Sequence, residues 1–162
     1  MQQDHFGTEK HNYHVSIINM SNPALTWASY LTYGAPRVIY HMCDAAQFEQ
    51  ATRNGATYFP PTYKADGFTH ASAYPVDLVA CGNNFYKSVK GDWICISINP
   101  AQLDGEVKYE LAANVGNTTT NDTTGLPKFP HIYGGIAKKD VMTVYKIVRG
   151  EDGSFLSIPG LC

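Results

Sequence analysis

The most informative run for the fold of this 162-residue chain is Trp93-Ile94-Cys95-Ile96-Ser97-Ile98. Isoleucine occupies every second position, with Trp, Cys and Ser between them. Such a run predicts a β-strand that is covered on both faces. The next periodic stretch, Glu106–Leu111, alternates charged and apolar residues and predicts a strand with one polar face. Strands are therefore expected to dominate the second half of the chain.

On either side of these two stretches, runs of β-branched and aromatic residues predict further strands at Tyr13–Met20, Arg37–Met42, Phe68–Ser72 and Val141–Val148. Helix start and stop residues predict helices at Ser21–Gly34, Asp44–Asn54 and from Tyr74 or Pro75 to Tyr86. The clearest is the second, with Asp44 as its cap and Gly55 after its end. These elements predict an α+β fold with a small, mostly antiparallel sheet and two or three short helices.

Two segments are expected to be irregular. Residues 58–67, with the Pro60-Pro61 pair, are expected to be extended and turning. Residues 114–128 form a long Thr-, Asn- and Gly-rich stretch, which is typical of a functional flap or lid.

The composition excludes several classes of function. Only 16% of residues are charged, the net charge is -2 and tyrosine occurs 11 times. This balance lacks the basic surface that nucleic-acid binding needs. No apolar run reaches the roughly 20 residues that span a bilayer. The N-terminal residues are polar and the four cysteines form no C-x-x-C pair, so we expect free thiols and a cytoplasmic protein.

Three histidines are the main candidates for chemistry: His41, His70 and His131. Each lies in or near a predicted strand among apolar neighbours, and imidazole titrates near neutral pH. Any one of them alone is more often a structural residue that hydrogen-bonds to the backbone. Glu110, on the polar face of its strand, is either an exposed carboxylate or the partner that orients a histidine. Ser72 either contacts a ligand or caps the following helix.

A metal site and a nucleophilic cysteine compete less well with acid–base chemistry. The three histidines and Glu110 are a conceivable ligand set, yet no H-x-H, H-x-x-x-H or H-E-x-x-H spacing is present, so no bound metal is expected. Cys43 follows His41 by two residues without any implied activation. Neither a G-x-G-x-x-G nor a Walker A sequence occurs, which excludes Rossmann and P-loop mechanisms.

Four motifs in order carry a resemblance to a known family: Val38–His41, Gly67–Ser72, Val107–Glu110 and Phe129–Gly134. The series resembles the family labelled "domain of unknown function 952", whose members carry I-Y-H, G-F-I-H-x-S, a strand-borne Glu and F-P-H-[IL]-Y-G. Thr69 stands where Ile is usual. The resemblance covers residues 37–148, and we expect a core domain there. Residues 1–36 are then an N-terminal extension and residues 149–162 a C-terminal tail.

That family has been grouped with ADP-ribosyltransferase-like domains, so the resemblance implies a split antiparallel sheet around a nicotinamide-dinucleotide cleft. His41 would then contact the ligand from the first strand. His70 with Ser72 would form the second motif, and Glu110 the acidic third. Lys108 stands where arginine-modifying transferases have an acidic residue, and His131 has no counterpart in their usual triad.

We expect an enzyme that acts on a small organic molecule without a redox cofactor. His70 and His131 would exchange protons with the substrate while Glu110 orients one of them. Positioning of the substrate is expected from His41, Ser72, Tyr40 and Tyr133. Isomerisation, cyclisation, elimination or hydrolysis would suit such a pocket, and its tyrosines favour a neutral ligand. The alternatives are NAD-dependent ADP-ribosyl or nucleotide transfer and a binding protein without catalysis.

Overall fold

The computed structural model describes residues 36–111 and 128–162 of the chain. The described part is α+β, every strand pairing in it is antiparallel, and its helices are short, as predicted. The predicted elements at 13–20 and 21–34 and the stretch 114–127 lie outside the described residues. In chain order the elements are β1 (Ile39–Asp44), α2 (Ala45–Thr52), β2 (Thr57–Tyr58), α3 (Tyr63–Asp66), β3 (Thr69–His70), α4 (Pro75–Cys81), η1 (Gly82–Tyr86), β4 (Trp93–Ile98), η2 (Pro100–Gln102), β5 (Glu106–Leu111), β6 (Lys128–Tyr133), β7 (Ile136–Ala137), η3 (Lys138–Asp140), β8 (Val141–Lys146), β9 (Val148–Arg149) and β10 (Phe155–Ser157).

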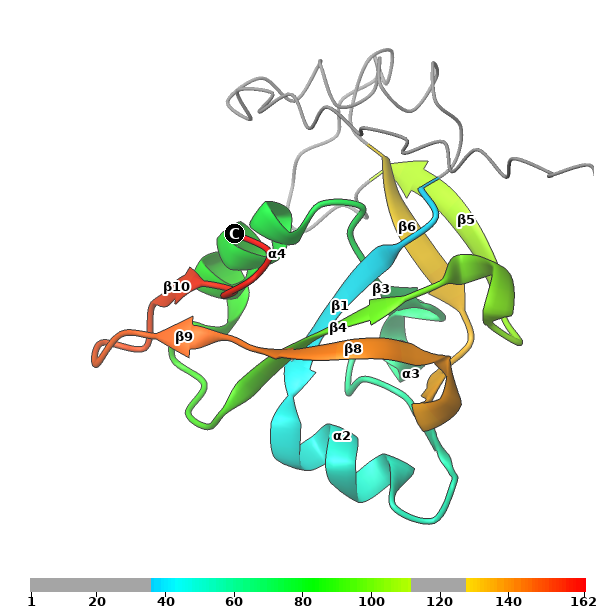
Figure 1. The fold of residues 1–162 in the computed structure, drawn as a ribbon, viewed down its shortest axis with the longest axis horizontal. Helices are drawn as coiled ribbons and strands as arrows, with labels where there is room; N and C mark the ends of the chain where they lie inside the picture. The colour runs from blue at the N-terminus through cyan, green and yellow to red at the C-terminus, as the bar shows by residue number, and fades with distance from the viewer. Residues whose placement is uncertain (1–35, 112–127) are drawn as a thin grey trace, which may run out of the picture.

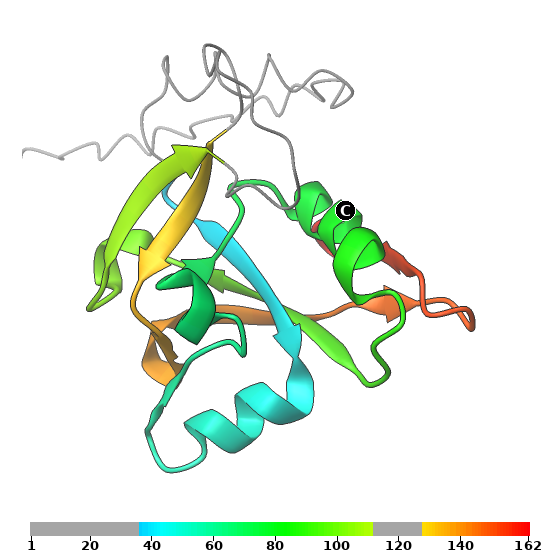
Figure 2. The same ribbon diagram turned by 180° about the vertical axis from the view of Figure 1, so that it is seen from behind.

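Two three-stranded sheets make the frame, one in the order β1-β4-β8 and the other in the order β3-β6-β5. They meet at an isolated bridge between Tyr40 and Ser72, whose backbones exchange hydrogen bonds of 2.8 and 2.7 Å. Figures 1 and 2 show α4 and β10 on one side of β1, and β3, β6 and β5 on its other side. The strands therefore form small linked sheets instead of one continuous sheet.

Strand β4 is the doubly covered strand that its sequence predicts. It lies between β1 and β8, and Cys95, Ile96 and Ile98 are fully buried. Ile96 and Ile98 belong to a core that includes Phe48 of α2 and residues of the β3-β6-β5 sheet. Trp93 and Cys95 belong to a second core, with residues from α4 and β10. A strand between two cores has no solvent face, so both residue parities are apolar.

Helix α2 forms where its cap predicts. The Asp44 Oδ1 atom accepts a hydrogen bond of 2.8 Å from the Gln47 N–H, which satisfies one of the free donors of the first turn. Phe48 and Thr52 are buried on one side, one helical turn apart. Gly55 then turns the chain with a φ of 76°.

The segment from Pro75 to Tyr86 is helical as predicted, but its last turn, η1, is π-helical and its buried face differs. Val76 and Val79 stand at helical spacing, yet Val76 is 38% exposed, while Leu78 and Gly82 are buried. A Cβ atom on Gly82 would lie 2.5 Å from Cγ of Phe155. Gly82 thus allows the Phe155 ring to pack directly against the helix backbone, a contact that helical periodicity alone does not reveal.

Two other details differ from the sequence-based expectation. Residues 58–67, expected to be extended and turning, contain the short helix α3. The Gly67 N–H donates a hydrogen bond to the carbonyl oxygen of Tyr63 and closes its helical turn. The expected strand Val141–Val148 is interrupted at Ile147, which turns inward, is 3% exposed and donates its N–H to Trp93 O. After β8, strands β9 and β10 form an antiparallel pair, and Phe155 and Ile158 belong to the second core.

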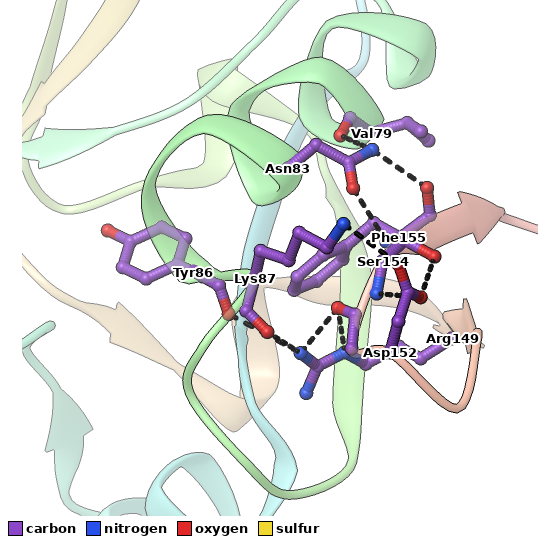
Figure 3. A network of polar contacts seen from close by, with 9 residues as sticks. Val79, Asn83, Tyr86, Lys87, Arg149, Asp152, Ser154 and Phe155 are labelled. Carbon is purple, nitrogen blue, oxygen red and sulfur yellow. Dashed lines mark hydrogen bonds and ion pairs between the residues drawn. The ribbon is translucent and has the colours of Figure 1, made fainter.

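Arg149 joins this C-terminal segment to the end of η1 (Figure 3). Its guanidinium donates to the carbonyl oxygens of five residues: Tyr86, Lys87, Val89, Gly91 and Gly153. The same group lies 4.5 Å from the centre of the Phe155 ring. A cation at the C-terminal end of a helix satisfies carbonyl groups that have no intrahelical partner. The C-terminal hairpin is therefore held by polar contacts as well as by the core.

Candidate functional site

The candidate site lies on the outer face of the β3-β6-β5 sheet. In its register His70 of β3 is opposite His131 of β6, and His131 is opposite Lys108 of β5. Directly opposed residues share a face of the sheet, so these three side chains form a row across the strands. Residues of the other parity, such as Ile132, face the first core. Strand pairing thus places groups from three distant parts of the chain side by side.

His131 is held by a carboxylate at the centre of this face. Its Nδ1 atom lies 3.0 Å from Oε2 of Glu110, and the Tyr133 hydroxyl donates to the same oxygen over 2.8 Å. Glu110 accepts both bonds as a carboxylate, so Nδ1 of the imidazole carries the hydrogen and Nε2 presents a lone pair. That Nε2 atom is buried and has no hydrogen-bond partner among the described residues. A buried nitrogen without a partner is a group available to a ligand.

The ionisation of this cluster follows from its geometry. Burial lowers the pKa of His131, and the hydrogen bond to Glu110 opposes this shift without cancelling it. The hydrogen bonds from Tyr133 and His131 lower the pKa of Glu110. The bond to Glu110 raises the pKa of Tyr133. At neutral pH the cluster therefore holds a neutral imidazole, a carboxylate and a neutral phenol, which is the state in which His131 accepts a proton.

Phe68 and His70 border His131. The Phe68 ring stacks on the His131 ring with centroids 3.9 Å apart, and the His70 ring stands edge-on to it at 5.4 Å. The His70 side chain is 47% exposed, whereas that of His131 is 3% exposed. The Nε2 atom of His70 lies 3.1 Å from Oδ2 of Asp66. Sequence reasoning did not single out Phe68 or Asp66, although both lie within four residues of His70.

His41 approaches the site through the backbone. Its ring is 5% exposed, and Nδ1 lies 2.6 Å from the carbonyl oxygen of His70, to which it donates. Its Nε2 atom is buried without a partner among the described residues. Burial lowers the pKa of His41 to about 4, so the imidazole is neutral at pH 7. His41 thus supports β3 at His70 and does not contact the His131–Glu110 pair.

The pH dependence of folding is expected to report on His41. In the unfolded chain a histidine pKa is near 6.5, above the value of about 4 in the folded protein. The unfolded state therefore binds more protons in this window, and the stability due to His41 is full above pH 6.5 and is lost as pH falls toward 4. At about 1.4 kcal/mol per pKa unit the loss reaches about 3 kcal/mol. Urea unfolding of the native protein and of His41→Asn at pH 7 and pH 4.5 measures it, because the variant lacks the titrating ring. Equal losses in the two proteins would contradict this prediction.

Ser72 and Tyr40 lie away from the His131–Glu110 pair. The Ser72 Oγ atom accepts from Tyr74 N–H at 3.0 Å and lies 2.8 Å from Oδ2 of Asp77, so it is engaged at the start of α4. Tyr40 packs against the second core, on the side of β1 opposite to His41. Among the described residues, no hydrogen bond or ring contact joins either side chain to His131 or Glu110. Of the predicted set, the structure brings together His70, His131, Glu110 and Tyr133.

Within the described ranges, little supports a metal site or a nucleophilic cysteine. No group of three or more His, Cys, Asp or Glu side chains there is arranged to hold a metal ion. Burial raises the pKa of Cys43, so its thiol does not supply the thiolate that a nucleophile requires.

A groove of about 480 Å³ between α2 and β8 is lined by residues such as Phe48, Ile94 and Val141 and contains none of the predicted site residues. In the same ranges no helix has the length and apolar character of a bilayer-spanning segment.

The model of a protein family described as "protein of unknown function (DUF952)" matches residues 42–144. That range contains His70, Glu110 and His131 and begins one residue after His41. The chain belongs to this family. A search of curated proteins found no match for this DUF952 chain.

Solved structures show the same fold. The crystal structure of protein CC0527 from Caulobacter crescentus is similar to the DUF952 chain with a TM-score of 0.56 and 19% identity, over 74% of this chain and 93% of that one. The solution NMR structure of CC0527 gives a TM-score of 0.53 at 18% identity, over 76% and 92% of the two chains. At this identity the likeness concerns the fold alone. The ADP-ribosyltransferase-like part of the expectation remains a prediction that these matches do not test.

Proposed function

We propose that this DUF952 protein is an enzyme that converts a small organic molecule by acid–base chemistry, with His131 as general base. One observation carries the proposal: a buried imidazole is held through Nδ1 by a carboxylate and presents an unpartnered Nε2. This pairing sets the tautomer and stabilises the imidazolium that forms when Nε2 takes a proton. Such an arrangement is typical of histidines that act in proton transfer.

In the proposed reaction Nε2 of His131 removes a proton from a carbon or oxygen atom of the substrate. Glu110 stabilises the resulting positive charge through the 3.0 Å hydrogen bond. His70, exposed beside it, acts in its imidazolium form: it delivers the proton on Nδ1 to the oxygen atom or leaving group on which negative charge develops, and it keeps the Nε2–H that Asp66 accepts. Since Nε2 is buried, the substrate reaches it after a local movement, and rotation of the Phe68 ring stacked on His131 is the simplest such movement. Isomerisation, elimination, cyclisation and hydrolysis are all compatible with these two proton transfers.

The charges around the row of basic groups favour a neutral or cationic substrate. Each basic side chain has its own carboxylate: Asp66 at His70, Glu110 at His131 and Glu106 at Lys108, the last pair 3.4 Å apart. Three carboxylates face one lysine, so the field is negative when the histidines are neutral. A pyrophosphate would be repelled here, which makes the dinucleotide the weaker candidate.

NAD-dependent ADP-ribosyl or nucleotide transfer stays the second proposal. The three residues that it would use come from separate parts of a split antiparallel arrangement: His41 from β1, Ser72 from the bridge after β3 and Glu110 from β5. In that chemistry Glu110 would stabilise an oxocarbenium-like transition state. A ligand-binding protein without catalysis is the third candidate, with the aromatic residues around His131 as its lining.

One screen separates these proposals. The native protein is incubated in D2O with a panel of ketones, 2-oxo acids, hydroxy acids and lactones, and separately with NAD, and proton NMR follows each mixture. We expect loss or exchange of a substrate proton signal for at least one compound, with the rate lowered at least ~100-fold in Glu110→Gln. Glu49→Gln, the same substitution at an exposed carboxylate of α2 outside the site, is the matched control and retains turnover. Release of nicotinamide from NAD would instead support transferase chemistry, and binding without conversion would support the third proposal.

A further inference from the structure

Asp66 is a second carboxylate of the candidate site, and its contact with His70 is built into the fold. The helix α3 ends at Asp66, and Gly67 follows with a φ of 79°, donating its N–H to Tyr63 O over 2.8 Å. This left-handed turn, which favours glycine, directs the chain from the helix into β3. Thr69 then anchors β3, since its hydroxyl donates to Gly134 O over 2.8 Å and its side chain is fully buried. Both ends of the Asp66–His70 contact therefore come from backbone that is held in place.

His70 is constrained from several directions at once. The Asp66 Oδ2 atom lies 3.1 Å from its Nε2, and the Phe68 ring stands edge-on to its ring at 4.7 Å. On the backbone side, its carbonyl accepts the hydrogen bond from His41. An ion pair as exposed as Asp66–His70 adds little to stability, so the contact is better explained by orientation of the ring.

The two carboxylate contacts assign opposite nitrogens to the two histidines. Glu110 holds Nδ1 of His131, which leaves Nε2 with a lone pair. Asp66 accepts from Nε2 of His70, which leaves Nδ1 with the lone pair and the ring turned accordingly. The edge-on packing of the two rings keeps these orientations next to each other.

We infer that Asp66 is a positioning residue: it holds His70 in the Nε2–H tautomer and orients its ring, so that the site contains two carboxylate–imidazole pairs, Asp66–His70 and Glu110–His131. The effect of Asp66 on catalysis rests on the proposed acid–base function. The tautomer of His70 does not depend on that proposal. Loss of Asp66 would leave the ring free to rotate and to exchange tautomers while His131 stays in place.

The variant Asp66→Asn tests the inference, with Glu106→Gln as the matched control on the same face. Long-range proton–nitrogen NMR of the imidazole at pH 9 measures the tautomer of His70. We expect only the Nε2–H tautomer in the native protein and in the control. The side-chain amide in Asp66→Asn can accept from the ring or donate to it, and in Asp66→Ser the short side chain cannot reach the ring, so both variants are expected to show both tautomers, with the modest excess of Nε2–H that a free histidine has. An exclusive Nε2–H tautomer in Asp66→Ser would overturn the inference.

Turnover of any compound found by the D2O screen gives the second readout. We expect kcat to fall roughly 10- to 100-fold in Asp66→Asn with KM nearly unchanged, because a group that orients another acts on the chemical step. Equal kcat in native and Asp66→Asn protein, with Glu110→Gln inactive, would overturn the role of Asp66 and leave the proposed function intact. A changed tautomer in a protein that converts no compound would refute the proposed function and support the positioning contact.

Discussion

A His131→Asn protein is expected to lose roughly 10²- to 10⁴-fold in kcat on the compound that the native protein converts. General acid–base groups contribute factors of this size to catalysis. The shorter amide places an N–H donor near the position of Nδ1 and so retains a hydrogen bond to Glu110, but it has no Nε2 that takes up a proton. The variant therefore removes proton transfer while it keeps the polar contact that spans β5 and β6. Steady-state kinetics at pH 7 and pH 8 measure the loss.

Tyr133→Phe is the control for His131→Asn. It removes the other hydrogen bond to Oε2 of Glu110 and leaves both the carboxylate and the imidazole. Its kcat is expected to fall far less than that of His131→Asn. Full activity of a folded His131→Asn protein would eliminate His131 as the base. Circular dichroism and the thermal unfolding midpoint of each variant establish that it is folded.

The largest effect on stability is expected from Arg149→Met. The methionine cannot replace the hydrogen bonds from the guanidinium to the five carbonyl groups of the η1 end and the C-terminal hairpin. Hydrogen bonds from charged groups are worth more than neutral ones, and part of this loss is recovered when water reaches the carbonyls. We expect the free energy of unfolding to fall by roughly 2–4 kcal/mol. For a chain of this size the unfolding midpoint would fall by roughly 5–15 °C.

Lys87→Met is the matched control for Arg149→Met (Figure 3). The Lys87 amine forms an ion pair of 2.8 Å with Asp152 in the same segment, but both side chains are at least half exposed. Exposed ion pairs contribute about 0–1 kcal/mol. Denaturant unfolding measures how far the free energy of unfolding falls in each variant. If Arg149→Met were as stable as Lys87→Met, the carbonyl contacts would not be what holds the hairpin.

Much of the fold is predictable from local chemistry. Strand β4 follows from a run that is apolar in both parities, and α2 follows from Asp44 and Gly55 at its ends. The buried face of the helical segment α4–η1 is not predictable in this way. Its Gly82 is buried by Phe155, more than 70 residues away in the chain. Helical spacing alone does not reveal this contact, because the packing of a distant ring decides which side of the helix is covered.

The family, the α+β class and the residue types available for chemistry are all predictable without a structure, because motifs, alternation and caps depend on near neighbours in the chain. Which of these residues meet depends on tertiary packing. The register of β3, β6 and β5 joins His131 to Glu110 and Tyr133 and places His70 beside them. Strand β1 contributes to both cores and places Tyr40 against the second one, while Ser72 is engaged at the start of α4. Strand register depends on contacts between segments far apart in sequence, and a shift of one residue would reverse every side chain, so only the folded sheet could select this cluster.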